Sequence, residues 1–173
     1  MKNKVIEVQN VHISISKQKL DDYICITDIA KAKSDSVRAA DVVRNWLRNR
    51  GTLEYLSVWE QIYNPNFKVF ESEHFKKQAG LLTFTPSVSE WVNETNAIGL
   101  YVKRGKYGGT YAHKDIAFEF ASAISPVFKL YLIKEFQRLK EEADILNVAL
   151  FGFTAKAWRE ANPELAKKNN VRD

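Results

Sequence analysis

Two pairs of neighbouring carboxylates are the first residues in this chain that could do chemistry. Asp21 and Asp22 are adjacent, and so are Glu141 and Glu142. Paired carboxylates can hold Mg²⁺, as a nuclease would require. Neighbouring side chains, however, point to opposite faces of a strand and diverge by about 100° around a helix, so neither pair forms a metal cage alone. We therefore expect that the protein is not an enzyme and has no catalytic residues.

Other metal, disulfide and export signals are also missing. Cys25 is the only cysteine, and His12, His74 and His113 lack the spacing of metal ligands. We expect no zinc site, no other metal and no cofactor. The N-terminus has no apolar signal segment, and no apolar run reaches the roughly 20 residues of a membrane span. These features predict a soluble, cytoplasmic protein with no membrane partner.

Positive charge is unevenly distributed along the chain, whose formal net charge is +5. Residues 103–114 carry four Lys or Arg and no Asp or Glu, and residues 1–50 carry ten against six. Residues 51–102, by contrast, carry three against six. Clustered positive charge favours a polyanionic partner such as a nucleic acid.

The cluster without acidic residues falls in a glycine-rich stretch. Residues 98–112 lose helical periodicity and contain four glycines, which predicts a β-hairpin with a glycine-rich tip. Lys103, Arg104 and Lys106 would place cations at this tip, and Tyr107 could stack on a base or sugar. Such a basic ribbon suits the DNA backbone. The simpler alternative is a hairpin tip that its charges keep soluble.

A second basic patch lies on a helix predicted over residues 37–50. Arg44 and Arg48 are four residues apart, with Asn45 beside the first. Taken alone, these residues could be a solvated helix face. Together with a basic hairpin in the same small domain they could straddle a duplex, so we include them as predicted contacts.

The remaining elements are predicted from apolar periodicity and capping residues. A strand over residues 5–16 is expected to pair with one over 23–26. Thr27 and Thr85 are expected as N-caps, the latter followed by Pro86, and Gly51 as the residue after a helix end. Further helices are expected over residues 52–63, 71–78, 85–96, 113–124, 125–144 and 154–161.

The helix over residues 125–144 carries an apolar stripe. Our first interpretation is that this stripe is buried in the core. The alternative is that it packs against a second copy, since its rings exceed what one small core needs. That alternative would make the chain a homodimer or a protein-interaction module. The stripe consists of Phe128, Tyr131, Leu132, Phe136 and Leu139.

Several blocks of the sequence resemble the KilA-N domain family of bacteria and large DNA viruses. The resemblance covers roughly residues 21–142, and the glycine-rich block together with the Ser-Pro-x-Phe block makes it specific. The blocks are YICITDIA at 23–30, WLRN at 46–49, AIGL at 97–100, GKYGGTYAHKDIA at 105–117, SPxFK at 125–129 and EFxRL at 135–139.

The resemblance implies a fold similar to the fungal APSES domain. We therefore expect an α+β, winged-helix-like fold, with a helix pair over residues 27–33 and 37–50, a β-hairpin wing over 98–112 and additional C-terminal helices. Residues 1–144 would form the DNA-binding domain. Residues 145–173 would form a partly frayed helical extension, resembling the start of a region that continues in relatives.

The resemblance also implies a function. Family members are phage or bacterial regulators, so the expected partner is double-stranded DNA and the expected place is the nucleoid in the host cytoplasm. Two alternatives stay open. One is an antirepressor that acts on a regulatory protein partner, and the other is RNA binding.

Overall fold

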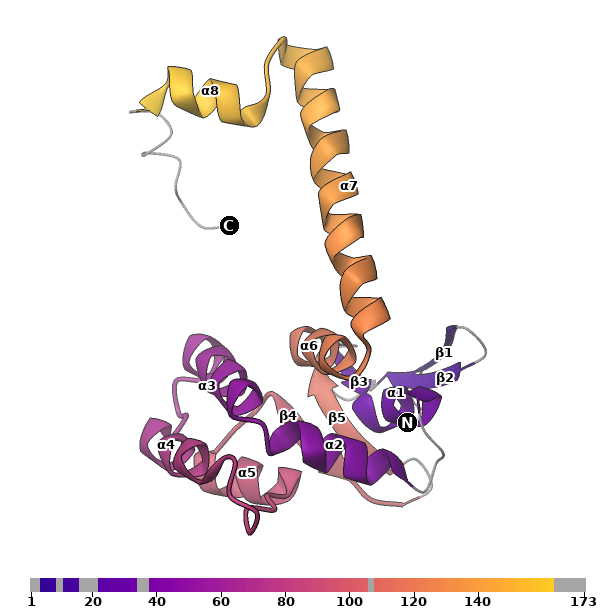
Figure 1. The fold of residues 1–173 in the computed structure, drawn as a ribbon, viewed down its shortest axis with the longest axis vertical. Helices are drawn as coiled ribbons and strands as arrows, with labels where there is room; N and C mark the ends of the chain where they lie inside the picture. The colour runs from indigo at the N-terminus through magenta and orange to yellow at the C-terminus, as the bar shows by residue number, and fades with distance from the viewer. Residues whose placement is uncertain (1–3, 9–10, 16–21, 34–37, 106–107, 164–173) are drawn as a thin grey trace. The chain divides into compact units, whose positions relative to one another are not determined.

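The computed structural model describes residues 4–8, 11–15, 22–33, 38–105 and 108–163. It divides into two compact units, Met1–Pro126 and Val127–Asp173, which we describe separately. In the described residues the first unit combines a five-stranded sheet with helices α1 to α6 (Figure 1). The α+β prediction is confirmed.

All strand pairs of the sheet are antiparallel, in the order β1-β2-β3-β5-β4. The strands are β1 (Lys4–Val8), β2 (Val11–Ile15), β3 (Tyr23–Cys25), β4 (Leu100–Lys103) and β5 (Gly109–His113). The prediction of one strand over residues 5–16 is wrong, because β1 and β2 pair with each other from Lys4↔Ile15 to Val8↔Val11. The predicted pairing with the strand near residue 24 is confirmed through Ile15↔Ile24.

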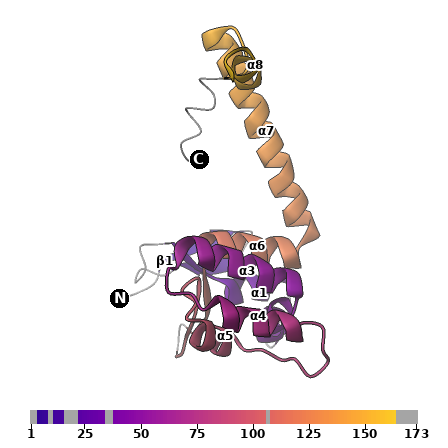
Figure 2. The same ribbon diagram turned by 90° about the vertical axis from the view of Figure 1, so that its left-hand side faces the viewer.

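The helices of the first unit share one apolar core with the sheet. They are α1 (Ile26–Lys33), α2 (Ala39–Leu47), α3 (Arg50–Tyr63), α4 (Val69–Gln78), α5 (Val88–Thr95) and α6 (Lys114–Ile124). Each contributes buried side chains to this core, which also includes Leu100 of β4 and Ala112 of β5. In Figure 2, α4 lies next to both α3 and α5. These six helices are thus held together by apolar contacts that their buried faces make.

Two of the predicted helix ends are wrong, at Thr27 and at Gly51. Thr27 lies within α1, and its Oγ1 accepts a hydrogen bond from the Thr110 amide over 2.9 Å. Gly51 lies in the first turn of α3 and does not end the helix before it. The Asn49 side chain caps α3 instead, accepting from the Gly51 amide over 2.8 Å. An asparagine is among the strongest N-caps, which explains the early restart.

The predicted cap of α5 is displaced by two residues. Ser87, not Thr85, is the N-cap, because Ser87 and Glu90 form a reciprocal capping box. This box satisfies two amides that would otherwise have no partner at the helix start. Pro86 does not open the helix, and its side chain is fully buried.

Helices α4 and α5 form an excursion whose two ends are tied together. The Asn64 side-chain amide donates to the Asn96 carbonyl over 2.8 Å, and the Asn96 side-chain amide donates to the Asn66 carbonyl over 3.1 Å. The Lys68 amide also donates to the Thr95 carbonyl over 2.9 Å. We call this set of bonds the asparagine clasp. Asn96 has φ of 56°, a left-handed conformation that asparagine tolerates well.

The second unit consists largely of the long helix α7 (Pro126–Phe151), followed by α8 (Ala155–Ala161). Helix α7 continues past the predicted end at residue 144. Within this unit the predicted stripe is not buried, since Tyr131, Phe136 and Leu139 are 58%, 71% and 54% exposed. Helix α8 has only seven residues, too few to cover a stripe of this length. A separate extension over residues 145–173 stays a prediction.

None of the described helices combines the length and the apolar character that crossing a bilayer requires.

Candidate nucleic-acid interface

The predicted hairpin is confirmed and forms a wing made of β4 and β5 (Figure 1). The two strands pair from Leu100↔Ala112 to Lys103↔Gly109. At the tip, the Gly108 amide donates to the Gly105 carbonyl over 2.8 Å, and Gly105 has φ of 98°. Only glycine adopts such a φ readily, so the sequence is suited to this chain reversal.

The strands of the wing are anchored to the first helix and to β3 close to the tip. The Thr110 amide is held by Thr27 Oγ1, and a Cβ on Gly109 would lie only 2.9 Å from the Cys25 Sγ. The rings of Tyr101 and Tyr111 stack with centroids 5.0 Å apart. Side-chain contacts therefore fix the strands of the wing along their length, in addition to the strand pairing.

A buried carboxylate fixes the entry into the wing. Glu60 on α3 is 1% exposed, and its Oε1 accepts from the amides of Gly99 over 2.7 Å and Ile98 over 3.0 Å. Its Oε2 accepts from the Asn64 side-chain amide over 2.8 Å. Burying a carboxylate is tolerated only with such hydrogen-bond donors. Sequence reasoning missed Glu60, although its place on the same helix face as Leu53 and Leu56 was an available signal.

Next to this carboxylate, Trp59 packs directly against the wing entry. A Cβ on Gly99 would lie 2.8 Å from the Trp59 ring and 2.5 Å from Ile116 Cδ1. The Trp59 Nε1 donates to Asp115 Oδ2 over 3.0 Å at the start of α6. Two successive residues of α3 thus hold both the entry of the wing and the helix that follows it.

The predicted cations of the wing lie at its outer end. Arg104 is exposed and Lys103 is partly buried at the end of β4. Neither forms an ion pair within the part of the chain that the structure describes. Lys106 and Tyr107 lie outside the described residues. Lys114, the fourth cation of the basic stretch, pairs with Asp22 over 2.9 Å, a contact that lowers the pKa of the Asp22 carboxyl.

Helix α2 and the tip end of the wing strands line a common groove of about 280 Å³, which we call the wing groove. Arg44 on α2 lies along it together with Val102 and Thr110 of the wing. The Arg44 Nη1 contacts Asp41 Oδ1 over 2.8 Å, with both side chains at least half exposed. Exposed pairs of this kind contribute at most about 1 kcal/mol, so a phosphate can replace the aspartate.

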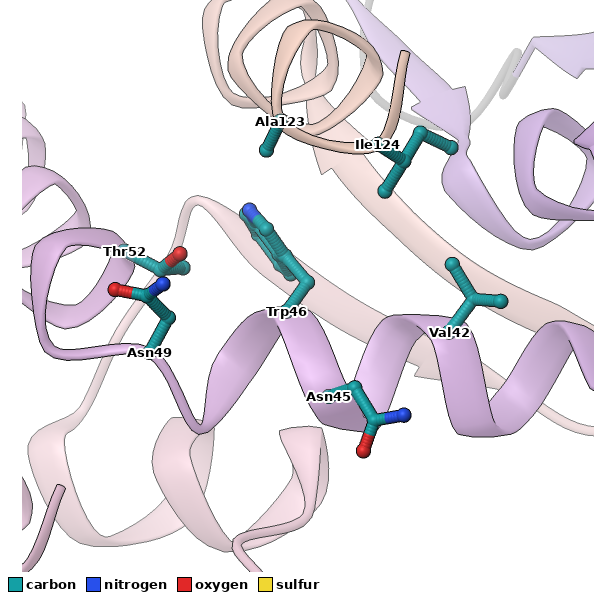
Figure 3. A pocket seen from close by; sticks show the side chains of 7 residues that line it. All are labelled: Val42, Asn45, Trp46, Asn49, Thr52, Ala123 and Ile124. Atoms are coloured by element: carbon teal, nitrogen blue, oxygen red, sulfur yellow. The ribbon is translucent and has the colours of Figure 1, made fainter. Parts of the chain in front are cut away.

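The other two predicted residues, Asn45 on α2 and Arg48 just after its end, do not line the wing groove. Asn45 and Asn49 line a pocket of about 390 Å³ between α2 and α6. Figure 3 shows Trp46 pointing toward Ala123 and Ile124, with Asn45 turned away from them.

Arg48 lies beside Asn45 at a second hollow, which Gly80 also lines. Its Nη2 donates to the Leu82 carbonyl over 3.4 Å. The predicted α2 patch therefore divides into Arg44 on the wing side, and Asn45 with Arg48 on another side.

Among the described residues, no group of three or more His, Cys, Asp or Glu side chains could hold a metal ion. Asp22 is engaged with Lys114, and Glu142 forms an ion pair with Arg138.

The model of the KilA-N domain family matches residues 6–142. The chain belongs to the KilA-N family. The resemblance predicted from the sequence blocks is thereby confirmed. KilA-N domains are a DNA-binding family and not an enzyme family, which supports a DNA-binding role. The KilA-N match includes the whole wing and α2. Searches of the curated proteins and of the solved structures found no significant match.

Proposed function

We propose that this KilA-N chain binds double-stranded DNA through its wing and the wing side of α2. One observation carries the proposal. Arg44 and the tip end of the wing strands line the same groove, and the exposed Arg104 follows directly after β4 at that same end of the wing. Cations that come from two elements are thereby presented around one concave surface.

Phosphate contacts would supply most of the affinity in this arrangement. Lys103, Arg104 and Lys106 would neutralise phosphates from the wing, and Arg44 would exchange Asp41 for a phosphate. Tyr107 would add stacking or a hydrogen bond to the backbone. Arg104 could also read a guanine edge, because an arginine fork matches its two acceptors in the major groove.

Asn45 and Arg48 take a secondary part in the proposal. They lie on another side of α2, so they would contact a flanking stretch of backbone and not the phosphates in the wing groove. Duplex DNA is preferred over RNA as the partner, because the deep, narrow major groove of A-form RNA does not admit a protein ribbon. We extend the proposal to a phage or bacterial transcription regulator that acts at the nucleoid of its host cell.

Fluorescence anisotropy with a random-sequence duplex, measured at rising salt, tests the proposal. The wild type is compared with a Lys103/Arg104/Lys106→Ala variant. An Arg50/Lys68/Lys77→Ala variant is the matched control, because it removes the same charge from exposed residues of α3 and the segment around α4. The wing variant should lose at least tenfold in affinity and about three units of salt slope.

Absence of wild-type binding at low salt would refute the proposal, as would an equal loss in the control variant. Competition with duplex RNA of the same sequence then checks the choice of partner. RNA that competes as well as DNA would remove the preference for DNA.

A further inference from the structure

Helix α7 exposes a row of large apolar side chains. Phe136, Leu139 and Leu146 are 71%, 54% and 61% exposed, and Leu132 is partly exposed. Soluble proteins seldom expose apolar side chains in a continuous row unless the row is a contact surface. The helix has 26 residues, whereas its neighbour in the second unit, α8, has seven. Most of the stability of a protein helix comes from the packing of its apolar face, so a row of this length on α7 calls for a packing partner.

The spacing along this row is that of a coiled coil. Leu132, Phe136, Leu139, Ala143 and Leu146 follow each other at intervals of four, three, four and three residues. In heptad terms, residues 132, 139 and 146 occupy d positions and residues 136 and 143 occupy a positions. An alternation of this kind forms a seam that fits another helix.

The charges beside this seam favour a particular partner. Glu135 and Glu142 occupy g positions, and Lys140 occupies the e position between them. In a parallel pair, each g residue faces the e residue five positions further along the other helix, so Glu135 of one chain would face Lys140 of the other. In an antiparallel pair, g faces g, and the glutamates would repel one another.

Both charged groups are accessible for such a contact. Lys140 is exposed and has no ion pair within the described residues. Glu135 contacts Arg138 Nη2 over 3.0 Å on its own helix. This exposed pair is weak and can exchange.

From this pattern we propose that α7 is a dimerisation helix, which pairs in parallel and in register with α7 of a second copy of this chain. The proposal is independent of DNA binding, since it uses a different part of the chain. The parallel pairing also explains why the small residue Ala143 lies in the seam. A small residue at an a position lets the two helices approach closely beside the bulky Phe136.

Sedimentation equilibrium of the full chain, from about 1 to about 100 µM, measures the association directly. The wild type should form dimers in this range. Leu139→Asp should weaken dimerisation at least tenfold. Ile145→Asp is the matched control, because Ile145 is similarly exposed but lies off the seam. A wild type that stays monomeric throughout would refute the proposal, and so would equal weakening by the two variants.

Cross-linking tests the parallel register without disrupting the helix. In register, the two thiols introduced by an Ala143→Cys substitution, one on each chain, would face each other within disulfide range. Mild oxidation should cross-link this variant much faster than Ile145→Cys. The native Cys25 is 1% exposed and should not interfere. A dimer in which Ala143→Cys cross-links no faster than Ile145→Cys would overturn the proposal.

A charge exchange supplies a third test. Lys140→Glu should weaken dimerisation by about three- to tenfold, because it places glutamates opposite one another. Adding Glu135→Lys should restore most of the loss. If the double variant does not regain dimerisation, although circular dichroism shows the same helix content as in the wild type, the parallel pairing is contradicted.

Discussion

The backbone amide of Gly99 donates to Glu60 Oε1 over 2.7 Å, so a single buried carboxylate on α3 sets the position at which the wing begins. The amide of Ile98 and the side chain of Asn64 donate to the same carboxylate. Strand β4 starts at the next residue, Leu100. Glu60 is therefore a structural residue of the wing, although it lies far from the wing in sequence.

Replacing Glu60 with leucine should destabilise the protein by about 3 kcal/mol or more. The change leaves buried hydrogen-bond donors without an acceptor, and each costs about 1–3 kcal/mol. Urea denaturation followed by tryptophan fluorescence measures the loss. Glu54→Leu is the control, because Glu54 is exposed and pairs with Arg50 along the same helix. A cost below 1 kcal/mol for Glu60→Leu would contradict the role assigned to this carboxylate.

The glycine at the wing entry should not accept a methyl group. In Gly99→Ala, the new Cβ would overlap Trp59 and Ile116, which predicts a loss of about 1–3 kcal/mol from overpacking. In Gly51→Ala, the nearest atom is Asn49 Oδ1 at 3.3 Å, and α3 gains a better helix former. Thermal unfolding should show Gly51→Ala near or above the wild type and Gly99→Ala clearly below it. The reverse order would contradict the packing described at the wing entry.

Single substitutions should show which exposed cations contribute phosphate contacts to DNA binding and which do not. Arg104→Ala and Arg44→Ala should each reduce the slope of log affinity against log salt by about 0.9, the value for one lost phosphate contact. Arg50→Ala removes an exposed cation that does not line the wing groove, so it should leave the slope unchanged. Anisotropy titrations at several salt concentrations measure all three. An Arg44 variant that behaves like the Arg50 variant would exclude α2 from the interface.

Asp28 should contribute stability that depends on pH. Burial raises the pKa of its carboxyl, but hydrogen bonds from Lys31 Nζ and from the Ser14 amide outweigh burial, so the pKa lies below the ordinary value of 3.8. A lowered pKa means that the ionised form stabilises the folded state above the unfolded pKa. That contribution is lost as the pH falls through the folded value.

An Asp28→Asn variant should accordingly be less stable than the wild type by about 1 kcal/mol at pH 7, after allowance for the partial exposure of the carboxyl. The difference should be constant down to about pH 4 and then shrink. Urea titrations of both proteins across this range measure it. A difference that grows on acidification would contradict the assignment.

The wing could be predicted from sequence because its signal is local. Helical periodicity fails between Ile98 and Ala112, and the glycines fall where the chain reverses. The place of Glu60 on the apolar face of its helix indicated burial, but its role in the wing could not be recognised from a local signal. Its partners at residues 98 and 99 are backbone amides nearly 40 residues away, and backbone amides leave no signature in a sequence.

The side chains on helices were harder to predict than the helices themselves. Arg44 and Asn45 are neighbours in sequence, but a rotation of about 100° places them on different sides of α2. The stripe on α7 illustrates a second limit. An apolar period shows that a face needs a partner, but it does not show whether the partner is the same chain or another.

The asparagine clasp has a consequence for the continuity of the backbone. Because the clasp joins the two ends of the α4–α5 excursion, the chain leaves and returns at one point. Leu82, in the loop between these helices, is 93% exposed. A protease that cuts this loop would produce two fragments that stay associated, with Phe75 on one and Trp91 on the other still in edge contact. The same loop is therefore a natural position for new termini in a circular permutant, or for an inserted reporter domain.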